Sequence, residues 1–248
     1  MRDGRGRGIL RRHGPETAPP RPTGTWRDAV EVLVLAYAIG YLVRILLFGD
    51  RRSPTAHVMQ RMVAELTWLV VVAVWLRIRG ARWATAFGRP ARAWPEVRDG
   101  AVFGAILYGT VALAVALPAA WILRLVTDRD VEARVPLPEG LPPIGWAVAV
   151  VLALLVAPIA EEVLFRGVLV PAVRQRFGVA VAVAGSSLVF GLAHVTRGDP
   201  LQVTVEVAVA TAMGVGLAIQ YARRGNLVAP VAAHLAFNVL GLLILLRR

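Results

Sequence analysis

The sequence predicts an all-α, polytopic transmembrane helix bundle of about seven spans, with eight as the alternative count. Of the 248 residues, 57% are hydrophobic, which exceeds the roughly 45–50% apolar content of soluble domains. Several apolar runs approach the ~20 residues that a helix needs to cross a bilayer. Backbone polar groups in lipid must be paired internally, and these runs are too long for barrel strands. The pattern therefore favours helices over a β-barrel.

The charge of the chain indicates a lipid bilayer as its surroundings. The net charge is +12, and all 28 basic residues are arginines. The arginines cluster just outside the apolar runs, so membrane topology explains them better than nucleic-acid binding does. We expect no nucleic-acid partner. The absence of cysteine excludes disulfides, zinc–thiolate sites and cysteine nucleophiles. The lysine-free, Ala/Val/Arg-rich composition is typical of a high-GC bacterial genome.

The expected elements begin with a disordered, basic cytoplasmic tail over residues 1–25, rich in arginine, glycine and proline. Each apolar run of suitable length is then interpreted as one span. The spans are 30–48, 58–76, 100–126, a long one from 144 toward 176, 179–195, 201–221 and 227–246. The sequence thus divides into N-terminal transmembrane helices over 26–142 and a C-terminal helix bundle over 143–248.

Two features of the N-terminal helices have structural consequences. The polar segment 77–99 carries Trp83 and Trp94, and tryptophans suit the membrane–water interface, so we expect this loop to lie along the membrane surface. Gly100 and Gly104 are four residues apart at the start of the third span, which allows a neighbouring helix to approach closely.

The distribution of arginines predicts the orientation. Arginine-rich segments occur at the N-terminus and in every second connection, at 77–98, 174–176 and 223–224, whereas the alternating connections have fewer arginines or balance them with acids. The positive-inside rule then predicts a multi-pass protein of the plasma membrane with a cytoplasmic N-terminus. Seven spans would place the C-terminus outside. The arginines at 247 and 248 favour the opposite side, so the count of spans could differ by one.

The most informative residues are the polar ones inside the apolar spans, where charge costs free energy and usually persists for function. Residues four apart lie on one face of a helix, so Glu162 and Arg166 can pair, whereas Glu161 points about 100° away toward a different partner. The fifth span ends in His194, and the last span carries two further polar residues that share a face, His234 and Asn238.

Two interpretations of these residues stay open. Glu162 and Arg166 could form a structural ion pair, and an isolated intramembrane histidine is often only a packing residue. However, three helices each contribute polar groups of complementary types, which favours a site. Two other intramembrane acids, Glu65 and Glu206, have no patterned neighbours and are interpreted as structural.

A carboxylate flanked by two imidazoles can hold and deprotonate a water, and an Asn amide can donate to the oxyanion of a tetrahedral intermediate. Alternatively, Glu161, His194 and His234 are a sufficient ligand set for a catalytic zinc ion, with water in the fourth position. Both mechanisms lead to amide hydrolysis. Other protease and nucleotide motifs are missing: the sequence contains no His-Glu-x-x-His, Gly-x-Ser-x-Gly, Walker or Rossmann pattern.

Three motifs in order resemble one known family. They are Glu161-Glu162-x-x-x-Arg166, Phe190-x-x-x-His194 and His234-x-x-x-Asn238. Over roughly residues 145–246 the chain is similar to the CPBP (CAAX-processing and bacteriocin-processing, or Abi) family of intramembrane proteases.

This resemblance implies a role for each motif residue. It implies that Glu161 activates water and that Glu162 and Arg166 support it. His194 and His234 would bind the water or a metal. Asn238 would polarise the scissile carbonyl or steady the intermediate. The family is commonly labelled metalloprotease, although a metal-free mechanism is also argued for it, so both Zn²⁺ and a metal-free site stay open.

The first hypothesis is therefore an intramembrane endopeptidase acting on a membrane-associated peptide or protein, either CAAX-like or bacteriocin/leader-like. The alternatives are a non-enzymatic immunity factor or scaffold and, third, a proton-coupled transporter. The substrate and the oligomeric state stay open.

One geometric conflict arises if all spans are straight. His194 would then lie near the outer end of its span and His234 nearer the inner side. We expect Pro158 to kink the long fourth span and Pro171 to end its apolar part. A tilted span, or a kink at Pro158 or at Gly185, could bring the two imidazoles to the same depth.

Overall fold

The computed structural model describes residues 24–51, 53–127, 140–195 and 199–247. Most of the predicted basic tail, and residues 128–139 between the third and fourth expected spans, lie outside the described residues. Within these ranges the regular secondary structure is entirely helical, which confirms the all-α prediction. The helices are α1 (Trp26–Phe48), α2 (Pro54–Ile78), α3 (Trp83–Phe87), α4 (Ala93–Val111), α5 (Leu117–Thr127), α6 (Pro143–Val151), α7 (Ala157–Glu161), α8 (Val170–Leu192), α9 (Pro200–Arg224) and α10 (Val228–Leu245), with π-helical segments η1 (Ala112–Ala116), η2 (Leu152–Val156) and η3 (Glu162–Leu169).

Three of the long helices, α1, α2 and α9, start at residues whose side chains cap free backbone N–H groups. Thr25 and Asp28 form a capping box at the start of α1. Ser53 caps α2 and precedes a proline in its first turn. Helix α9 starts in the same way, because Asp199 accepts from the backbone N–H of Leu201. It ends at Gly225, whose φ of 65° is the left-handed conformation that glycine adopts without strain.

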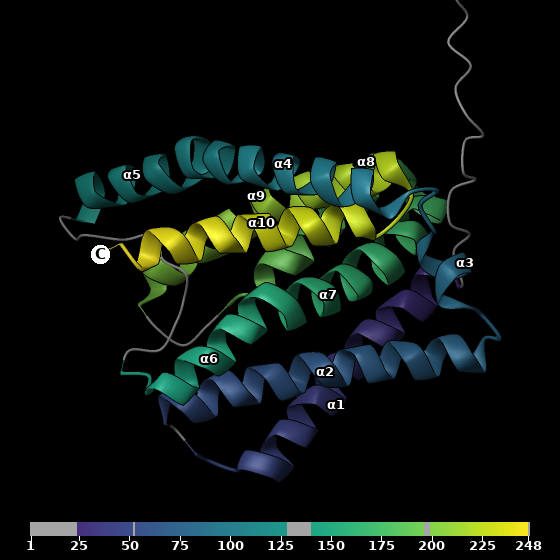
Figure 1. Ribbon diagram of the computed structural model, residues 1–248, viewed down its shortest axis with the longest axis horizontal. Helices are drawn as coiled ribbons and strands as arrows, with labels where there is room; N and C mark the ends of the chain where they lie inside the picture. The colour runs from purple at the N-terminus through teal and green to yellow at the C-terminus, as the bar shows by residue number, and fades with distance from the viewer. Residues whose placement is uncertain (1–23, 52, 128–139, 196–198, 248) are drawn as a thin grey trace, which may run out of the picture.

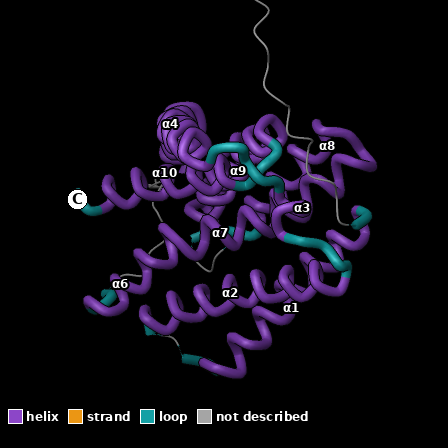
Figure 2. The backbone as a smooth tube through the Cα atoms, turned by 45° about the vertical axis from the view of Figure 1, so that its right-hand side comes forward, coloured by secondary structure: helices purple, strands orange, loops and turns teal. Residues whose placement is uncertain are grey.

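The helices pack in pairs around a central helical run (Figure 1). Helices α1 and α2 lie side by side, α4 lies along α10, and α8 lies along α9. The run from α6 through η3 passes between the α1–α2 pair and the α4–α10 pair (Figure 2). The main hydrophobic core draws residues from both halves of the chain. The central run is therefore enclosed by helices from both halves.

The π-helical segments have a common cause in the sequence. Each one ends two residues before a proline, at Pro118, Pro158 and Pro171 respectively. A proline in a helix lacks the N–H donor, and its ring clashes with the carbonyl one turn earlier. A wider π-helical turn accommodates both effects. The expected disturbance at Pro158 is thus a widened turn. Pro171 was expected to end the apolar part of the span, and the helix itself continues beyond this proline to Phe177.

Among the described residues, five helical stretches are long and apolar enough to cross a membrane, by length and composition: 26–48, 93–127, 143–192, 200–224 and 228–245. The predicted count of about seven spans is therefore not confirmed. The expected second span corresponds to α2, which is not among the five. The expected fourth and fifth spans fall within the single stretch 143–192, which breaks at Gly178 with φ 85° and ψ 170°. The chain thus turns at Gly178, not at Gly185, which lies inside the following helical segment.

The glycine pair at the start of the third span allows the close approach that the sequence predicted. A Cβ atom at Gly100 would lie 2.4 Å from the carbonyl oxygen of Ala229, and one at Gly104 would lie 2.1 Å from that of Ala233. Both distances are far below van der Waals contact, so only glycine permits this crossing of α4 and α10. The crossing matters for the site because α10 carries His234.

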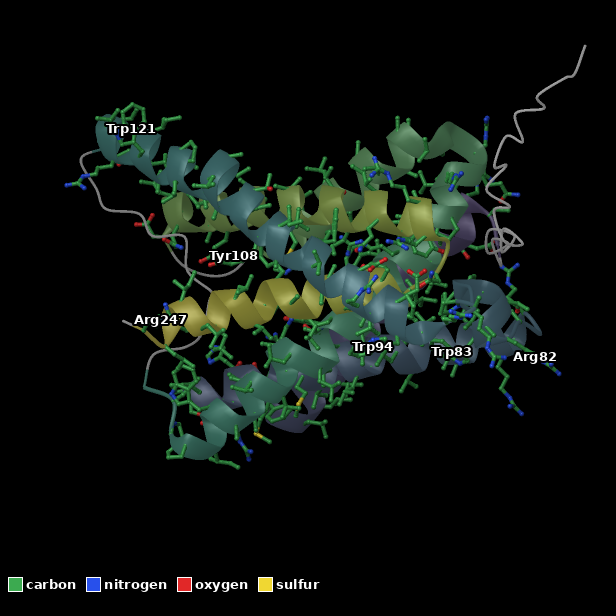
Figure 3. All side chains as sticks on the ribbon, turned by 45° about the horizontal axis from the view of Figure 1, so that its top comes forward. Arg82, Trp83, Trp94, Tyr108, Trp121 and Arg247 are labelled. Carbon is green, nitrogen blue, oxygen red and sulfur yellow. The ribbon has the colours of Figure 1, made fainter. Side chains whose placement is uncertain are left out.

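Both ends of the bundle carry arginine and tryptophan side chains. Figure 3 shows Arg82 and Trp83 at one end and Trp121 and Arg247 at the other. Trp83 and Trp94 are exposed, and α3 with the start of α4 replaces most of the predicted loop 77–99. The C-terminus lies at the end opposite α3 (Figure 1).

Candidate active site

The centre of the candidate site is the junction between α7 and η3, where two consecutive glutamates are buried. Glu161 is 2% exposed and Glu162 is 0% exposed. Every residue of η3 is buried as well. π-helical turns are rare and often occur at functional positions. A carboxylate at such depth needs partners, because burying an unpaired charge is costly.

Glu162 has two partners. Its Oε1 accepts from Arg166 Nη1 at 2.9 Å, as the spacing of four predicted, and lies 3.0 Å from His234 Nδ1. The same guanidinium donates to the carbonyl oxygen of Gly214 at 3.2 Å and lies over the ring of Phe190, 4.4 Å from its centroid. Arg166 is thus fully enclosed, and Glu162 links the arginine to an imidazole on α10.

Glu161 faces both intramembrane histidines. Its Oε1 lies 3.9 Å from His194 Nε2, and its Oε2 lies 3.8 Å from His234 Nε2. The two imidazoles are therefore at the same depth, which removes the conflict expected for straight spans. The segment that ends near His194 starts only after the break at Gly178, so it is a short segment that ends beside Glu161.

The hydrogen bonds of the imidazoles define which nitrogen is free. His194 Nδ1 lies 2.8 Å from the carbonyl oxygen of Phe190, and a carbonyl can only accept, so this nitrogen is the protonated one. His234 Nδ1 faces the Glu162 carboxylate and is protonated by the same reasoning. In the neutral form, both rings then present an unprotonated Nε2 toward Glu161.

Phe190 forms the apolar wall behind these groups. Its ring centroid lies 4.7 Å from that of His194 and 6.2 Å from that of His234, and it meets the ring of Phe165 at 5.1 Å. With the guanidinium of Arg166 over one face, the ring fixes the orientation of three functional side chains. This contact explains why phenylalanine stands one turn before His194.

Asn238 lies away from the carboxylates, one turn beyond His234. Its Nδ2 donates to the carbonyl oxygen of Ala153 at 2.8 Å. In the π-helical turn, the N–H of Ala157 donates to the carbonyl oxygen of residue 152. The residue that would donate to Ala153 in the same way is Pro158, which has no N–H. Asn238 therefore satisfies a carbonyl that the proline leaves without a donor, and it fastens α10 to η2.

Sequence reasoning missed Arg61. Its Nη2 donates to Glu161 Oε1 at 2.9 Å, and its Nε pairs with Glu65 one turn further along α2. The signal available in the sequence was a basic and an acidic residue four apart within an apolar run. Glu206, the other acid interpreted as structural, accepts from Gln202 on its own helix.

The donor types for a metal are present at the site. The two free Nε2 atoms and the Glu161 carboxylate are nitrogen and oxygen ligands that zinc accepts. Each imidazole also donates its other N–H to a carbonyl or carboxylate, as zinc-binding histidines usually do. Among the described residues, however, no three His, Cys, Asp or Glu side chains are close enough to form a metal-holding group.

Fold and site together define a class: a bundle of apolar helices that encloses two carboxylates, two arginines and two imidazoles. Residues 143–240 match the family model described as Rce1-like, Type II CAAX prenyl endopeptidase Rce1-like. Over these residues the chain matches the CPBP family, as the three motifs predicted. It is a family of CAAX-type intramembrane proteases. No curated protein and no solved structure matches the chain.

Proposed function

We propose that the protein is an intramembrane endopeptidase that hydrolyses a peptide bond by means of a water activated at Glu161. The observation that carries the proposal is that one buried carboxylate faces the free Nε2 atoms of both His194 and His234, at 3.9 and 3.8 Å. These separations are too long for direct hydrogen bonds and suit one bridging water.

In the proposed reaction, Glu161 accepts a proton from the water, whose oxygen attacks the carbonyl carbon of the scissile amide. The bond between that carbon and the amide nitrogen then breaks, and the leaving nitrogen takes the proton held at Glu161. Both neutral imidazoles present an accepting Nε2, and one of them accepts the other O–H of the water and so orients it. A general base of this kind contributes about 10²–10⁴-fold to the rate.

Glu162, Arg166 and Asn238 have supporting roles in this proposal. Glu162 holds the tautomer of His234 through Nδ1, and Arg166 offsets the charge of Glu162. Asn238 uses one N–H of Nδ2 on Ala153. The role that the family resemblance implies for Asn238, polarising the scissile carbonyl, would use the second N–H of the same nitrogen.

A zinc ion is the cofactor that this donor set would hold, with Glu161, His194 and His234 as its ligands. Bound there, zinc would acidify its water and polarise the substrate carbonyl. The same three residues would act with or without the metal, and the proposed reaction, hydrolysis of a peptide bond, is the same in both cases. Whether activity survives a chelator distinguishes the two forms.

The proposed substrate is a membrane-associated peptide or protein, CAAX-like or bacteriocin/leader-like. The family match supports a membrane-anchored substrate of the CAAX type. We also propose a multi-pass protein of the plasma membrane with a cytoplasmic N-terminus, because the arginines at 77–98, 174–176 and 223–224 lie in alternate connections of the sequence.

The test is cleavage of two synthetic reporters by the purified protein in liposomes, one with a prenylated CAAX-type C-terminus and one with a hydrophobic leader segment. Glu161→Gln, His194→Ala and His234→Ala should each abolish cleavage while the yield of folded protein is unchanged. Glu206→Gln is the matched control, because it neutralises another intramembrane glutamate outside the site. Full activity in any one of the three site variants contradicts the proposal. Loss of a cellular phenotype only when the protein level falls would favour a scaffold.

A further inference from the structure

We infer that Arg61 of α2 is a positioning residue for Glu161 and is itself held in place by Glu65. This inference rests on the proposed function, because it concerns how the base is oriented. Arg61 lies outside residues 143–240, the part of the chain that matches the family model. The N-terminal helices would then complete a site whose other residues all belong to the C-terminal bundle.

The geometry gives Arg61 two carboxylate partners on different helices. Nη2 donates to Glu161 Oε1 at 2.9 Å, and Nε pairs with Glu65 Oε1. The spacing of four places Arg61 and Glu65 on one face of α2, so this pair forms within the helix. The guanidinium also lies 5.9 Å from the ring centroid of Trp68 on the same helix. A planar guanidinium with fixed N–H directions suits simultaneous contact with two carboxylates.

The contact with Arg61 fixes the rotation of the Glu161 carboxylate. Because Oε1 accepts from Arg61, Oε2 is the oxygen that faces His234 at 3.8 Å. Without the arginine, the carboxylate could rotate away from the imidazoles, and a general base must be held in the right geometry to act. The effect of Arg61 on catalysis therefore passes through Glu161.

The balance of charge supports the same assignment. Each of the two consecutive glutamates has an arginine of its own: Arg166 for Glu162 and Arg61 for Glu161. Glu65 is almost fully buried, so it anchors Nε of the guanidinium while Nη2 reaches Glu161. If Arg61 served only the stability of α2, its pair with Glu65 would suffice, and no contact with the central helical run would be needed.

The kinetic test compares variants of Arg61 with a matched arginine. Arg61→Gln should lower kcat about 100-fold or more, with KM within about threefold, at equal yield of folded protein. Arg61→Lys should recover about a tenth of the wild-type kcat, because lysine keeps the charge but lacks the fixed N–H groups that bind both carboxylates. Glu65→Gln should lower kcat about tenfold, because it releases the guanidinium on one side.

Arg79→Gln is the control, because Arg79 caps the C-terminal end of the same helix, is similarly exposed (40% against 36%) and also pairs with a carboxylate, Asp28 of α1. We expect its kcat to stay within about twofold of wild type, because it lies ~27 Å along the helix from Arg61. The inference is overturned if Arg61→Gln keeps a kcat within about threefold of wild type, or if it loses no more than Arg79→Gln does.

A second measurement does not depend on activity. The chain has no cysteine, so a pair of introduced cysteines reports proximity without background. Arg61→Cys with Glu161→Cys should be joined by a short bifunctional thiol reagent, whereas Arg79→Cys with Glu161→Cys should not. Failure of the first pair to react overturns the inference. If that pair reacts but the wild-type protein cleaves neither reporter, the proposed function fails and the contact itself holds.

Discussion

The Glu162–Arg166 pair allows a sharp separation of stability from catalysis. The perturbation is a set of three variants: Glu162→Leu, Arg166→Met, and the two combined. Both side chains are at most 1% exposed, and the carboxylate also meets His234. Each single change leaves one buried charge without its partner, whereas the combined change removes both charges and keeps an apolar interior.

The expected magnitudes follow from that geometry. Breaking a buried ion pair from one side costs about 3–5 kcal/mol of folding free energy, which shifts the unfolding equilibrium between about a hundred- and several thousandfold. Replacing both charged residues lowers the folding free energy less than either single change does. The remaining cost, about 1–3 kcal/mol, comes from the Nδ1–H of His234, which loses its acceptor. The combined variant should therefore be more stable than either single one.

Stability would be measured by reversible unfolding in mixed micelles, and activity by cleavage of the reporter in the same micelles. The combined variant should regain most of the folding free energy and remain at least about 100-fold less active, because His234 is no longer oriented. The reasoning is refuted if the combined variant is as unstable as the single ones, since the two residues would then not be an energetic pair. It is also refuted if the combined variant recovers wild-type kcat.

The remaining predictions concern the helix contacts and the cofactor. Asn238→Ala should lower the free energy of unfolding by about 1–3 kcal/mol, because the carbonyl of Ala153 loses its donor. This loss should be smaller in a Pro158→Ala protein, where a backbone N–H is restored. Equal losses in both proteins would contradict the role given to Asn238. Gly104→Ala should clearly lower the melting temperature, because its Cβ would meet a carbonyl oxygen at 2.1 Å. Gly109→Ala should not, because a Cβ at Gly109 has no neighbouring atom within 4 Å. Equal melting temperatures of the two variants would disprove the tight crossing of α4 and α10. If zinc occupies the site, a chelator should abolish cleavage and added zinc should restore it, with metal analysis showing about one ion per chain; full activity of metal-free protein would exclude a required zinc.

What the sequence could predict was mostly local. The Glu162–Arg166 pair follows from a spacing of four residues, because helix geometry alone brings such side chains together. The direction of Glu161 away from that pair follows from the same geometry. The three motifs predicted the family, and the match over residues 143–240 confirms that prediction. Gly100 and Gly104 likewise predicted a close helix contact, although not that α10 is the partner.

The features that the sequence missed depend on tertiary packing. Arg61 and Glu161 are 100 residues apart, and only the packing of α2 against the central run joins them. The common depth of the imidazoles depends on how the chain turns at Gly178. The sequence placed a boundary between two spans there, but a boundary alone does not show the direction that the next helix takes. The bond from Asn238 to Ala153 needs both a π-helical turn and a facing helix, so its motif alone suggested only a role at the substrate.

The central claim is that Glu161, His194 and His234 act as one unit on one water. The most direct test is the kcat of Glu161→Gln, His234→Ala and the variant that combines them, with folded protein verified in each case. Residues that act as a unit give losses that do not multiply. The account predicts that each single change lowers kcat about a thousandfold and that the combined variant is scarcely worse than Glu161→Gln alone. Losses that multiply, or a single variant within tenfold of wild type, would contradict it.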